Sequence, residues 1–303
     1  MLQIEKYAAI DIGSNAIRLL IATILEKEGF DTQFKKTSLV RVPIRLGADV
    51  FLEDKISEVN YLRMKDAMNA FSLIMKTHKV KHYKACATSA MREAKNGAEI
   101  AARLKKETGI SIQIIDGKKE AAYISTTDLH DLVKENDVFL YVDVGGGSTE
   151  FTVFAEGQRV TSKSFPLGTV RILNDMIREQ LWEEVKIWIK ENTSMYSKVQ
   201  VIGSGGNINS IFKASGTKMG KPLSYFFLVN YYEKLKSLTY HERIFDLQMN
   251  PDRADVIIPA TRIYLSAMKW SKAKNIFVPK VGLADGMVRS MYLKNKAKLE
   301  KKE

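Results

Sequence analysis

Two short segments of the chain combine a carboxylate, small residues and hydroxyl side chains in the pattern of phosphate-binding loops. They are Asp11-Ile-Gly-Ser-Asn15 and Asp143-Val-Gly-Gly-Gly-Ser-Thr149. In each, an apolar β-prone run ends at the aspartate, and the small residues that follow let backbone N–H groups approach an anion closely. A glycine run alone usually only makes a turn, but the added carboxylate and hydroxyls favour a phosphate site.

Two further strand-turn-helix segments can contribute to such a site. Thr88 and Ser89 offer hydroxyls and amides at a helix start, and Arg92, one turn later, offers a bidentate guanidinium. Arg92 is equally explained as a helix-surface residue, and the Gly205-Gly206 turn as an ordinary tight turn. The candidate phosphate ligands are Ser14, Asn15, Thr88, Ser89, Arg92, Gly145, Gly146, Gly147, Ser148, Thr149, Gly205 and Gly206.

Carboxylates this close to a phosphate site require a cation between the two kinds of negative group. We therefore expect Mg²⁺ as cofactor, held by Asp143, with Glu150 and Asp11 as further candidate ligands. The histidines and the single cysteine, Cys86, show no zinc-site spacing. We expect Cys86 to be a small buried hydrophobe.

Glu120 lies in the first turn of a predicted helix that follows Asp116 and Gly117. A carboxylate at that place often only complements the positive end of the helix dipole. From its spacing alone, Glu120 is better explained as a helix-capping residue than as a catalytic one.

The first loop and its surrounding strands recur 132 residues later in the sequence. Asp11 aligns with Asp143 without a gap, and Arg18 aligns with Glu150. Each copy is followed by a second strand-turn-helix unit, at residues 85–92 and 199–207. A repeat of about half the chain length predicts two copies of one α/β domain, with the ligand at the strand ends in the cleft between them.

We expect the domains to span residues 1–125 and 126–303, each with one phosphate loop. A C-terminal helix over about 286–303 is compatible with packing back on the first domain. Apolar residues from Leu62 to Met75, mostly spaced by three or four, predict a helix that ends near Lys79 and belongs to the core. Further helices are predicted over 91–106 and about 119–133.

The 303 residues carry a formal net charge of +12, which attracts polyanions such as polyphosphate, nucleotides or nucleic acid. A solvated lysine surface explains the same excess. No recognition helix or aromatic stacking motif points to nucleic acid, which we rank last. The absence of a signal peptide and of a long apolar run leads us to expect a cytoplasmic protein without membrane association.

The chain resembles the exopolyphosphatase and guanosine pentaphosphate phosphatase (Ppx/GppA) family, in its short two-domain form. Eight stretches in the family's order carry the resemblance: Ala9-Ile-Asp-Ile-Gly-Ser-Asn15, Arg45-Leu-Gly47, Ala87-Thr-Ser-Ala-Met-Arg92, Gly117-Lys-Lys-Glu-Ala121, Val142-Asp-Val-Gly-Gly-Gly-Ser-Thr-Glu150, Pro166-Leu-Gly168, Ile202-Gly-Ser-Gly-Gly206 and Arg253-Ala-Asp255. Asn207 departs from the threonine that many members have there, and Ala284-Asp285 replaces a common Arg-Glu pair.

The resemblance implies two actin-like (ribonuclease H-like) α/β domains around an active-site cleft, and Mg²⁺-dependent hydrolysis of a terminal phosphoanhydride. It also implies that Glu120 is the catalytic base or water-orienting residue, and that Asp143 and Glu150 act on metal and water. The expected substrate is inorganic polyphosphate, or alternatively the 5′-phosphate of guanosine pentaphosphate. A nucleotide-binding sensor without turnover and an ATP-dependent sugar kinase are less favoured alternatives, and a homodimer is kept open.

Overall fold

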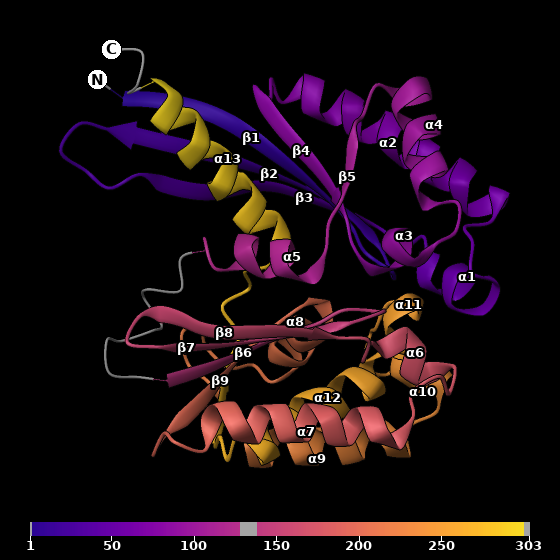
Figure 1. The fold of residues 1–303 in the computed structure, drawn as a ribbon, viewed down its shortest axis with the longest axis vertical. Coiled ribbons are helices and arrows are strands. Elements are labelled where there is room, and N and C mark those ends of the chain that lie inside the picture. The colour runs from indigo at the N-terminus through magenta and orange to yellow at the C-terminus, as the bar shows by residue number, and fades with distance from the viewer. Residues whose placement is uncertain (1, 128–137, 300–303) are drawn as a thin grey trace. The chain divides into compact units, whose positions relative to one another are not determined.

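The structure is a computed structural model that describes residues 2–127 and 138–299 (Figure 1). By their contacts, the described residues divide into one unit, 2–127 with 282–299, and a second unit, 138–281. The boundary expected from the sequence places the last segment in the second domain, with its helix allowed to pack back on the first, as it does. The segment lies in the first unit because its apolar side chains, among them Met287 and Tyr292, complete that unit's core.

The first unit is built on a five-stranded mixed sheet with the order β3-β2-β1-β4-β5. Its strands are β1 (Leu2–Ile12), β2 (Ile17–Lys27), β3 (Gln33–Val42), β4 (His82–Ala87) and β5 (Ile112–Ile114). The first three are joined antiparallel, whereas β4 and β5 run parallel to β1. Cys86 on β4 is fully buried, as expected.

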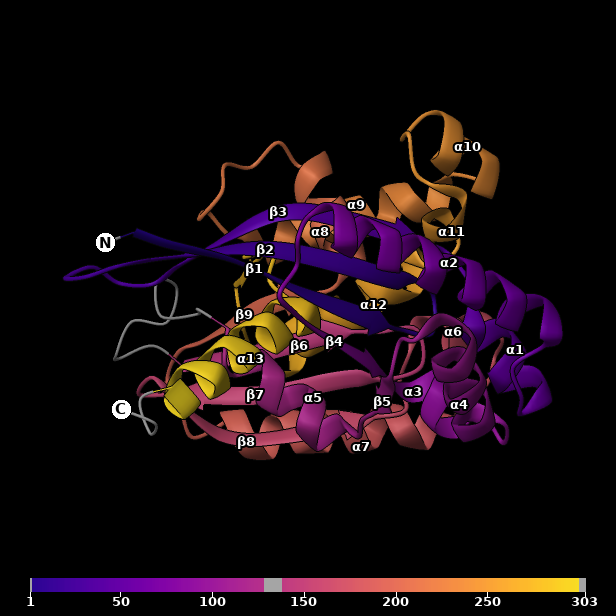
Figure 2. The same cartoon turned by 90° about the horizontal axis from the view of Figure 1, so that it is seen from above.

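Six helices of the described residues belong to this unit. They are α1 (Leu46–Glu53), α2 (Glu58–Thr77), α3 (Ser89–Glu93), α4 (Gly97–Thr108), α5 (Gly117–Ile124) and α13 (Leu283–Leu299). Helix α13 packs on α5 and on strands β1, β2 and β4, and Figures 1 and 2 show it lying along the sheet. The helix predicted over 119–133 ends at Ile124, and residues 128–137 and 300–303 lie outside the described residues.

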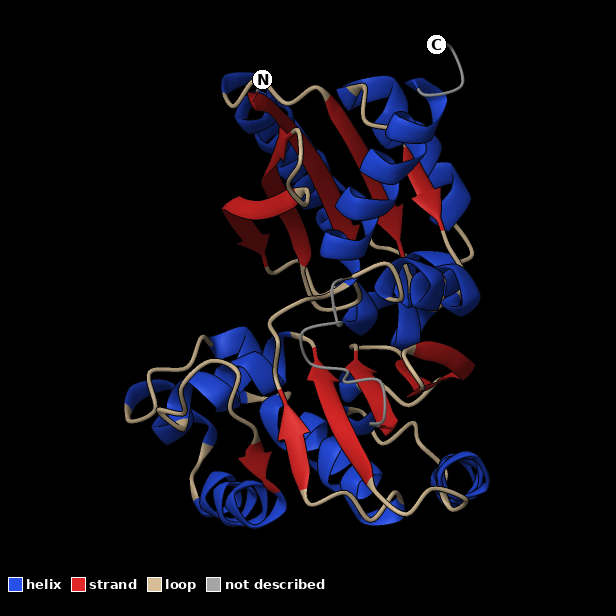
Figure 3. Ribbon diagram, turned by 90° about the vertical axis from the view of Figure 1, so that its left-hand side faces the viewer, coloured by secondary structure: helices blue, strands red, loops and turns tan. Residues whose placement is uncertain are grey.

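The second unit is built on a six-stranded mixed sheet with the order β10-β11-β9-β6-β7-β8. Its strands are β6 (Val138–Val144), β7 (Thr149–Ala155), β8 (Gln158–Phe165), β9 (Val199–Ser204), β10 (Leu223–Ser224) and β11 (Asn275–Phe277). Its helices are α6 (Thr169–Leu173), α7 (Glu179–Thr193), α8 (Gly206–Ala214), α9 (Tyr225–Ser237), α10 (Tyr240–Phe245), α11 (Pro251–Ala254) and α12 (Ile257–Trp270). Figure 3 shows the strands of each unit as one sheet with helices packed beside it.

The sequence repeat is a repeat of topology. In the first sheet a three-stranded antiparallel meander is followed by the parallel neighbour β4, and in the second the meander β6-β7-β8 is followed by the parallel neighbour β9. Both loops found in the sequence therefore connect the first two strands of a meander. Among the residues that the structure describes, no helix is both long and apolar enough to cross a membrane.

Candidate active site

In the first unit, three parallel strands end side by side and bring their loops to one edge of the sheet. Ile12 at the end of β1 pairs with Ala87 at the end of β4, which pairs with Ile114 at the end of β5. The hydroxyls of Ser14 and Ser89 are 2.9 Å apart. Two predicted loops, distant in sequence, are therefore in direct contact.

The turn after β1 is fixed by the backbone of its neighbours. The amide of Gly47 donates to the carbonyl of Ser14 at 2.7 Å, and the amide of Arg45 donates to that of Asn15 at 3.0 Å. The amide of Thr88 donates to the carbonyl of Ile12 at 3.1 Å. The loops are thus positioned by hydrogen bonds that leave the hydroxyls of Ser14 and Ser89 facing each other.

Arg92 lies in α3, and its guanidinium donates to the carbonyl of Ile115 at 2.8 Å. This hydrogen bond directs the guanidinium toward the segment that leads into α5. The guanidinium of an ordinary surface arginine would instead extend into solvent. Arg92 is half-buried, so it retains access to water.

Glu120 is a buried residue of the first turn of α5, with 7% of its surface exposed. The N-cap of this helix is Asp116, whose carboxylate accepts the amide of Lys119 at 2.8 Å. A favourable dipole contributes about 0.3–1 kcal/mol, whereas taking a carboxylate out of water costs several kcal/mol. Helix capping therefore does not explain why a glutamate is buried at this position.

Asp11 forms an ion pair within the first unit. It faces Arg18 across the β1–β2 pair, and the guanidinium lies 3.1 Å from the carboxylate. Burial raises the pKa of Asp11, and the nearby Arg18 partly opposes that rise. Asp11 thus already has a cationic partner on its own sheet.

The equivalent position in the second unit places two carboxylates opposite each other. Asp143 on β6 pairs in register with Glu150 on β7. Glu150 is buried, and its Oε1 accepts hydrogen bonds from the hydroxyls of Ser148 and Ser164, both at 2.8 Å. Like charges directly opposite on a sheet are destabilising, so this pair suits a divalent cation.

The described residues contain no group of three or more His, Cys, Asp or Glu side chains that could enclose a metal ion. Mg²⁺ commonly keeps several waters and binds through one or two carboxylates together with substrate phosphates. Asp143 and Glu150 therefore fit Mg²⁺ as carboxylate ligands, with the remaining positions left to water and phosphate.

The Gly145–Gly147 loop is held from behind by the start of α6. The amides of Thr169 and Val170 donate to the carbonyls of Gly145 and Gly146 at 3.0 and 2.8 Å, and Arg171 Nε donates to that of Gly147 at 2.8 Å. These bonds occupy three consecutive carbonyls and so fix the loop.

Thr149, one of the predicted phosphate ligands, directs its side chain to the backbone of a neighbouring segment. Its side chain is fully buried, and its hydroxyl donates to the carbonyl of Leu167. This hydroxyl joins the loop to the segment before α6. The hydroxyl of Ser148 donates to the carboxylate of Glu150.

The Gly205–Gly206 turn follows β9, next to the loop after β6, because Asp143 pairs with Ser204. Gly205 has φ +104°, a conformation that side chains disfavour, and an added Cβ would lie 3.3 Å from Asp143 Oδ1. An added Cβ at Gly206 would lie 2.8 Å from the guanidinium of Arg253. Gly205 is thus required by its backbone conformation, whereas a larger residue at Gly206 would displace the Arg253 guanidinium.

Two residues beside this turn were not among the candidates from the sequence. Arg253 on α11 donates to Asn207 Oδ1 at 3.3 Å, and Tyr264 on α12 donates its hydroxyl to the carbonyl of Ser204. Burial, reinforced by the charge of Asp143, raises the pKa of Tyr264 well above its usual value. The Arg253-Ala-Asp255 stretch was the available signal, whereas Tyr264 has no sequence pattern to mark it.

Known proteins are similar to this chain over the regions that contain these residues. A model of the Ppx/GppA phosphatase family matches residues 26–295. The chain is 34% identical over 209 residues to the bifunctional 3-dehydroquinate synthase/phosphatase of Fusobacterium nucleatum, covering 62% of this chain and 31% of that protein. It is 29% identical over 177 residues to exopolyphosphatase 2 of Mycobacterium tuberculosis, covering 56% and 54%. The chain spans from about a third to about half of the length of these curated relatives.

Solved structures match over nearly the whole chain. The crystal structure of the Aquifex aeolicus Ppx/GppA family member has a TM-score of 0.75 and 25% identity, covering 97% of this chain and 99% of that one. An exopolyphosphatase from Cytophaga hutchinsonii has a TM-score of 0.80 at 23% identity, covering 95% and 97%. The expected fold class of two actin-like α/β domains is confirmed.

The matched region includes most of the strand-end loops, the buried glutamate of α5 and the facing carboxylates of β6 and β7. Since the family model covers residues 26–295, the chain belongs to the Ppx/GppA phosphatase family.

Proposed function

We propose that this protein is a Mg²⁺-dependent exopolyphosphatase, which hydrolyses the terminal phosphoanhydride of inorganic polyphosphate and releases orthophosphate. The observation that carries the proposal is the strand-end loop present once in each unit, accompanied in the second by the facing carboxylates Asp143 and Glu150. Relatives named as exopolyphosphatases support the substrate class. The net charge of +12 suits a polyanionic substrate.

Phosphoryl transfer to water depends on positioning and on neutralising charge, since little covalent chemistry falls to the protein. In this proposal Glu120 orients the attacking water and accepts its proton. The hydroxyls of Ser14 and Ser89, with the guanidinium of Arg92, hold phosphate oxygens at the strand ends of the first unit.

The backbone of the Gly145–Gly147 loop and of the Gly205–Gly206 turn holds phosphate at the strand ends of the second unit. Bound Mg²⁺ would supply positive charge to the phosphate oxygens. Asp143 and Glu150 would hold it, and the hydroxyls of Ser148 and Ser164 fix the orientation of Glu150.

The test is orthophosphate release with Mg²⁺ from tripolyphosphate, long-chain polyphosphate and guanosine pentaphosphate. We expect release from the inorganic chains and its loss on chelation with EDTA, with recovery when Mg²⁺ is restored. Release from neither inorganic substrate would refute the proposal.

The second candidate is hydrolysis of the 5′-phosphate of guanosine pentaphosphate, the alternative substrate that the resemblance to the Ppx/GppA family implies. A kcat/KM for guanosine pentaphosphate well above that for tripolyphosphate would favour it. Binding of nucleotide without phosphate release from any substrate would favour the sensor instead. A cytoplasmic location and a homodimer stay predictions from the sequence.

A further inference from the structure

A pocket of about 790 Å³ lies within the second unit, at the amino ends of two neighbouring strands. Val199 begins β9 and Asn275 begins β11, and both residues line the pocket. An adjoining pocket of about 590 Å³ shares Lys272, Lys274 and Asn275 with it. We call the two together the lysine pocket.

The lysine pocket is separate from the phosphate loops of the same unit. Strand β9 begins at Val199 in the pocket and ends at Ser204, after which the Gly205–Gly206 turn follows. At about 3.3 Å per residue, the strand places about 17 Å between its two ends. A phosphate group held by the turn therefore does not reach the pocket.

The lining of the pocket is strongly basic. Lys190, Lys198, Lys272 and Lys274 line the larger part, and Lys269 joins the smaller part. No Asp or Glu is among the described residues that line either part, and within the described chain none of these five lysines forms an ion pair with a carboxylate. All five lysines are exposed, so their positive charge is accessible to a multivalent anion from solvent.

The helix dipole accounts for only part of this arrangement. Lys190 and Lys269 lie in the last turns of α7 and α12, where cations are favourable. Lys198, Lys272 and Lys274 lie outside both helices. Stabilisation of helix ends therefore does not explain why the other three lysines line the pocket.

The pocket also offers hydroxyl groups and flat rings. The hydroxyls of Thr193 and Ser271 turn back to the carbonyls of Ile189 and Ala267, at 2.6 and 2.7 Å. Ser194 and Ser197 line the pocket as well, with Trp270 beside them. Because Thr193 and Ser271 already donate to the backbone, Ser194 and Ser197 supply the hydroxyls that can donate to phosphate oxygens beside the lysines.

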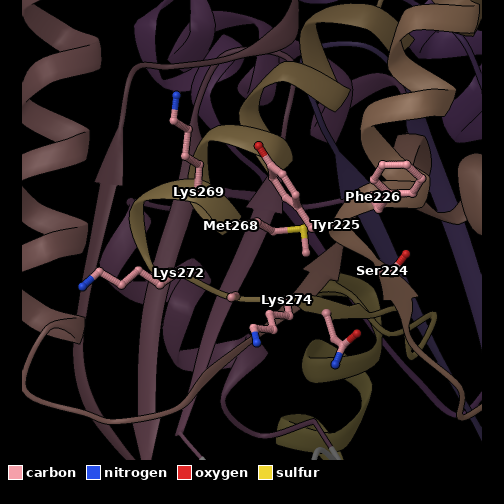
Figure 4. Close-up of a pocket in the computed structure, with 9 residues that line it drawn as sticks. Ser224, Tyr225, Phe226, Met268, Lys269, Lys272 and Lys274 are labelled. Carbon is pink, nitrogen blue, oxygen red and sulfur yellow. The ribbon is translucent and has the colours of Figure 1, made fainter.

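Figure 4 shows how the lysines of the smaller part are arranged. The side chains of Lys269, Lys272 and Lys274 extend in different directions around Met268 and Tyr225. Charges spread in this way fit an extended anion better than a single phosphate group.

We infer that the lysine pocket binds a phosphate chain, at a site additional to the strand-end loops. The choice of a phosphate chain among multivalent anions rests on the proposed function. The chain can come from inorganic polyphosphate or from a nucleoside triphosphate, and the two sources share the same oxyanion chemistry. A phosphate chain bound in the lysine pocket would occupy the second unit without contacting its strand-end loops.

The test is calorimetric titration of tripolyphosphate into the full chain carrying Glu120→Gln, so that turnover does not consume the ligand. Lys198→Gln with Lys272→Gln in that background is expected to weaken one class of sites at least tenfold. The control is Lys213→Gln with Lys234→Gln, which removes two exposed lysines from last turns of helices in the same unit. We expect the control to bind within twofold of its parent, and raised salt to weaken binding at the pocket.

The pair Lys198→Arg with Lys272→Arg keeps the charge and is expected to keep the binding. Equal binding by the glutamine pair and its control would overturn the inference, as would loss of binding by the arginine pair while circular dichroism shows that pair to be folded. A parallel titration with GTP identifies the source, since tighter binding than tripolyphosphate means that the base is also recognised. Failure of phosphate release with pocket binding intact would refute the proposed function alone, and the reverse result would refute this inference alone.

Discussion

The two units carry residues of opposite charge at the position that faces the strand-end aspartate. In the first unit Arg18 faces Asp11, with its guanidinium 3.1 Å from the carboxylate. In the second unit Glu150 faces Asp143 and adds a second negative charge. The second loop is therefore better suited than the first to hold a cation. For the proposed reaction we favour Asp143 and Glu150 over Asp11 as the Mg²⁺ ligands.

Glu120 is the residue whose removal distinguishes catalysis from structure most clearly. Glu120→Gln keeps the shape of the side chain but removes its ability to accept a proton. We expect a loss of about 10²–10⁴-fold in kcat for phosphate release, the usual contribution of a general base. Thermal unfolding should remain within a few degrees of the parent, because a buried charge is replaced by a neutral amide.

Glu99→Gln is the matched control for this variant. Glu99 also lies in the first turn of a helix, α4, but it is exposed. If the value of Glu120 were only its contribution to the helix dipole, the two variants would show the same small change in stability and unchanged kcat. That result would remove Glu120 from the mechanism.

At the scale of elements, helix periodicity predicted α2 well. The buried face contains Met64, Met68, Phe71 and Met75, as a helix core requires. Leu62, also assigned to that face, is 49% exposed. A single exposed apolar residue does not change the position of the helix, because the other apolar residues pack into the core and fix it.

The helix predicted over 91–106 is wrong in its continuity. The structure has α3 ending at Glu93 and α4 beginning at Gly97, with Ala94 in an extended conformation. Between them, the Asn96 side chain accepts the amide of Ile56 and donates to its carbonyl, both at 2.9 Å. A contact forty residues away in sequence therefore interrupts the helix, and no local pattern signals it.

The contact between α6 and the glycine loop makes a prediction about Gly168. An added Cβ would lie 2.2 Å from the carbonyl oxygen of Gly146, so Gly168→Ala must displace the Gly145–Gly147 loop. We expect kcat/KM for phosphate release to fall at least tenfold while the protein still folds. Steady-state kinetics together with circular dichroism measures both.

Gly216→Ala is the comparison for Gly168→Ala. Gly216 has φ +67° and no atom within 4 Å of an added Cβ, so its substitution strains the backbone without moving a neighbour. It should lower stability by about 1 kcal/mol and leave kcat/KM unchanged. Equal kinetic effects from the two variants would contradict a specific role for the loop position.

At the scale of the whole molecule, the last helix completes the first unit although the chain has passed through the second. Met287, Val288 and Tyr292 of α13 are buried with residues of β1 and β2 in one core. Thr126 donates its hydroxyl to the carbonyl of Gly286 at 3.0 Å. The helix that carries Glu120 is therefore supported by a segment more than 150 residues away.

Glu26 on β2 connects the strand to α13, and this contact predicts a pH dependence of stability. The Tyr292 hydroxyl donates to Glu26 and lowers its pKa from the usual 4.5, with a further contribution from Lys296 at 3.0 Å. A lowered pKa in the folded state stabilises the protein above about pH 4.5, and that stability is lost as the pH falls through the lowered value.

Glu26→Gln should therefore lower the unfolding midpoint at pH 7, and the midpoints of variant and parent should converge below pH 4.5. Urea unfolding across pH 3–7 measures the difference. Glu28→Gln, at an exposed position in the following turn, should run parallel to the parent throughout. A gap between Glu26→Gln and the parent that is independent of pH would show that the carboxylate charge is not involved.

Gly286 lies where the backbones of α13 and α5 are in close contact. An added Cβ would lie 2.0 Å from the carbonyl oxygen of Tyr123, so Gly286→Ala must push the two helices apart. We expect a loss of about 1–3 kcal/mol in the free energy of unfolding, measured by urea titration. Lys294→Ala, on an exposed position of the same helix, should change it by less than about 0.5 kcal/mol.

Much of the site could be read from the amino-acid sequence. The gapless repeat of Asp11 and Asp143 predicted two related α/β domains, because a repeat of about half the chain length is typical of two copies of one domain. The motifs identified the family and placed the loops at strand ends. These features are local in sequence, so residue type and spacing carry them. The cleft expected between the domains stays a prediction.

Other features depended on contacts between distant segments, which only the tertiary structure decides. Burial of Glu120 favours a role beyond capping, although its spacing alone favoured the opposite interpretation. The fold also commits the hydroxyl of Thr149 to Leu167, brings Arg253 to Gly206 and returns α13 to the first unit. Each follows from desolvation or close packing, whose free energies depend on which atoms surround a group and not on its neighbours in sequence.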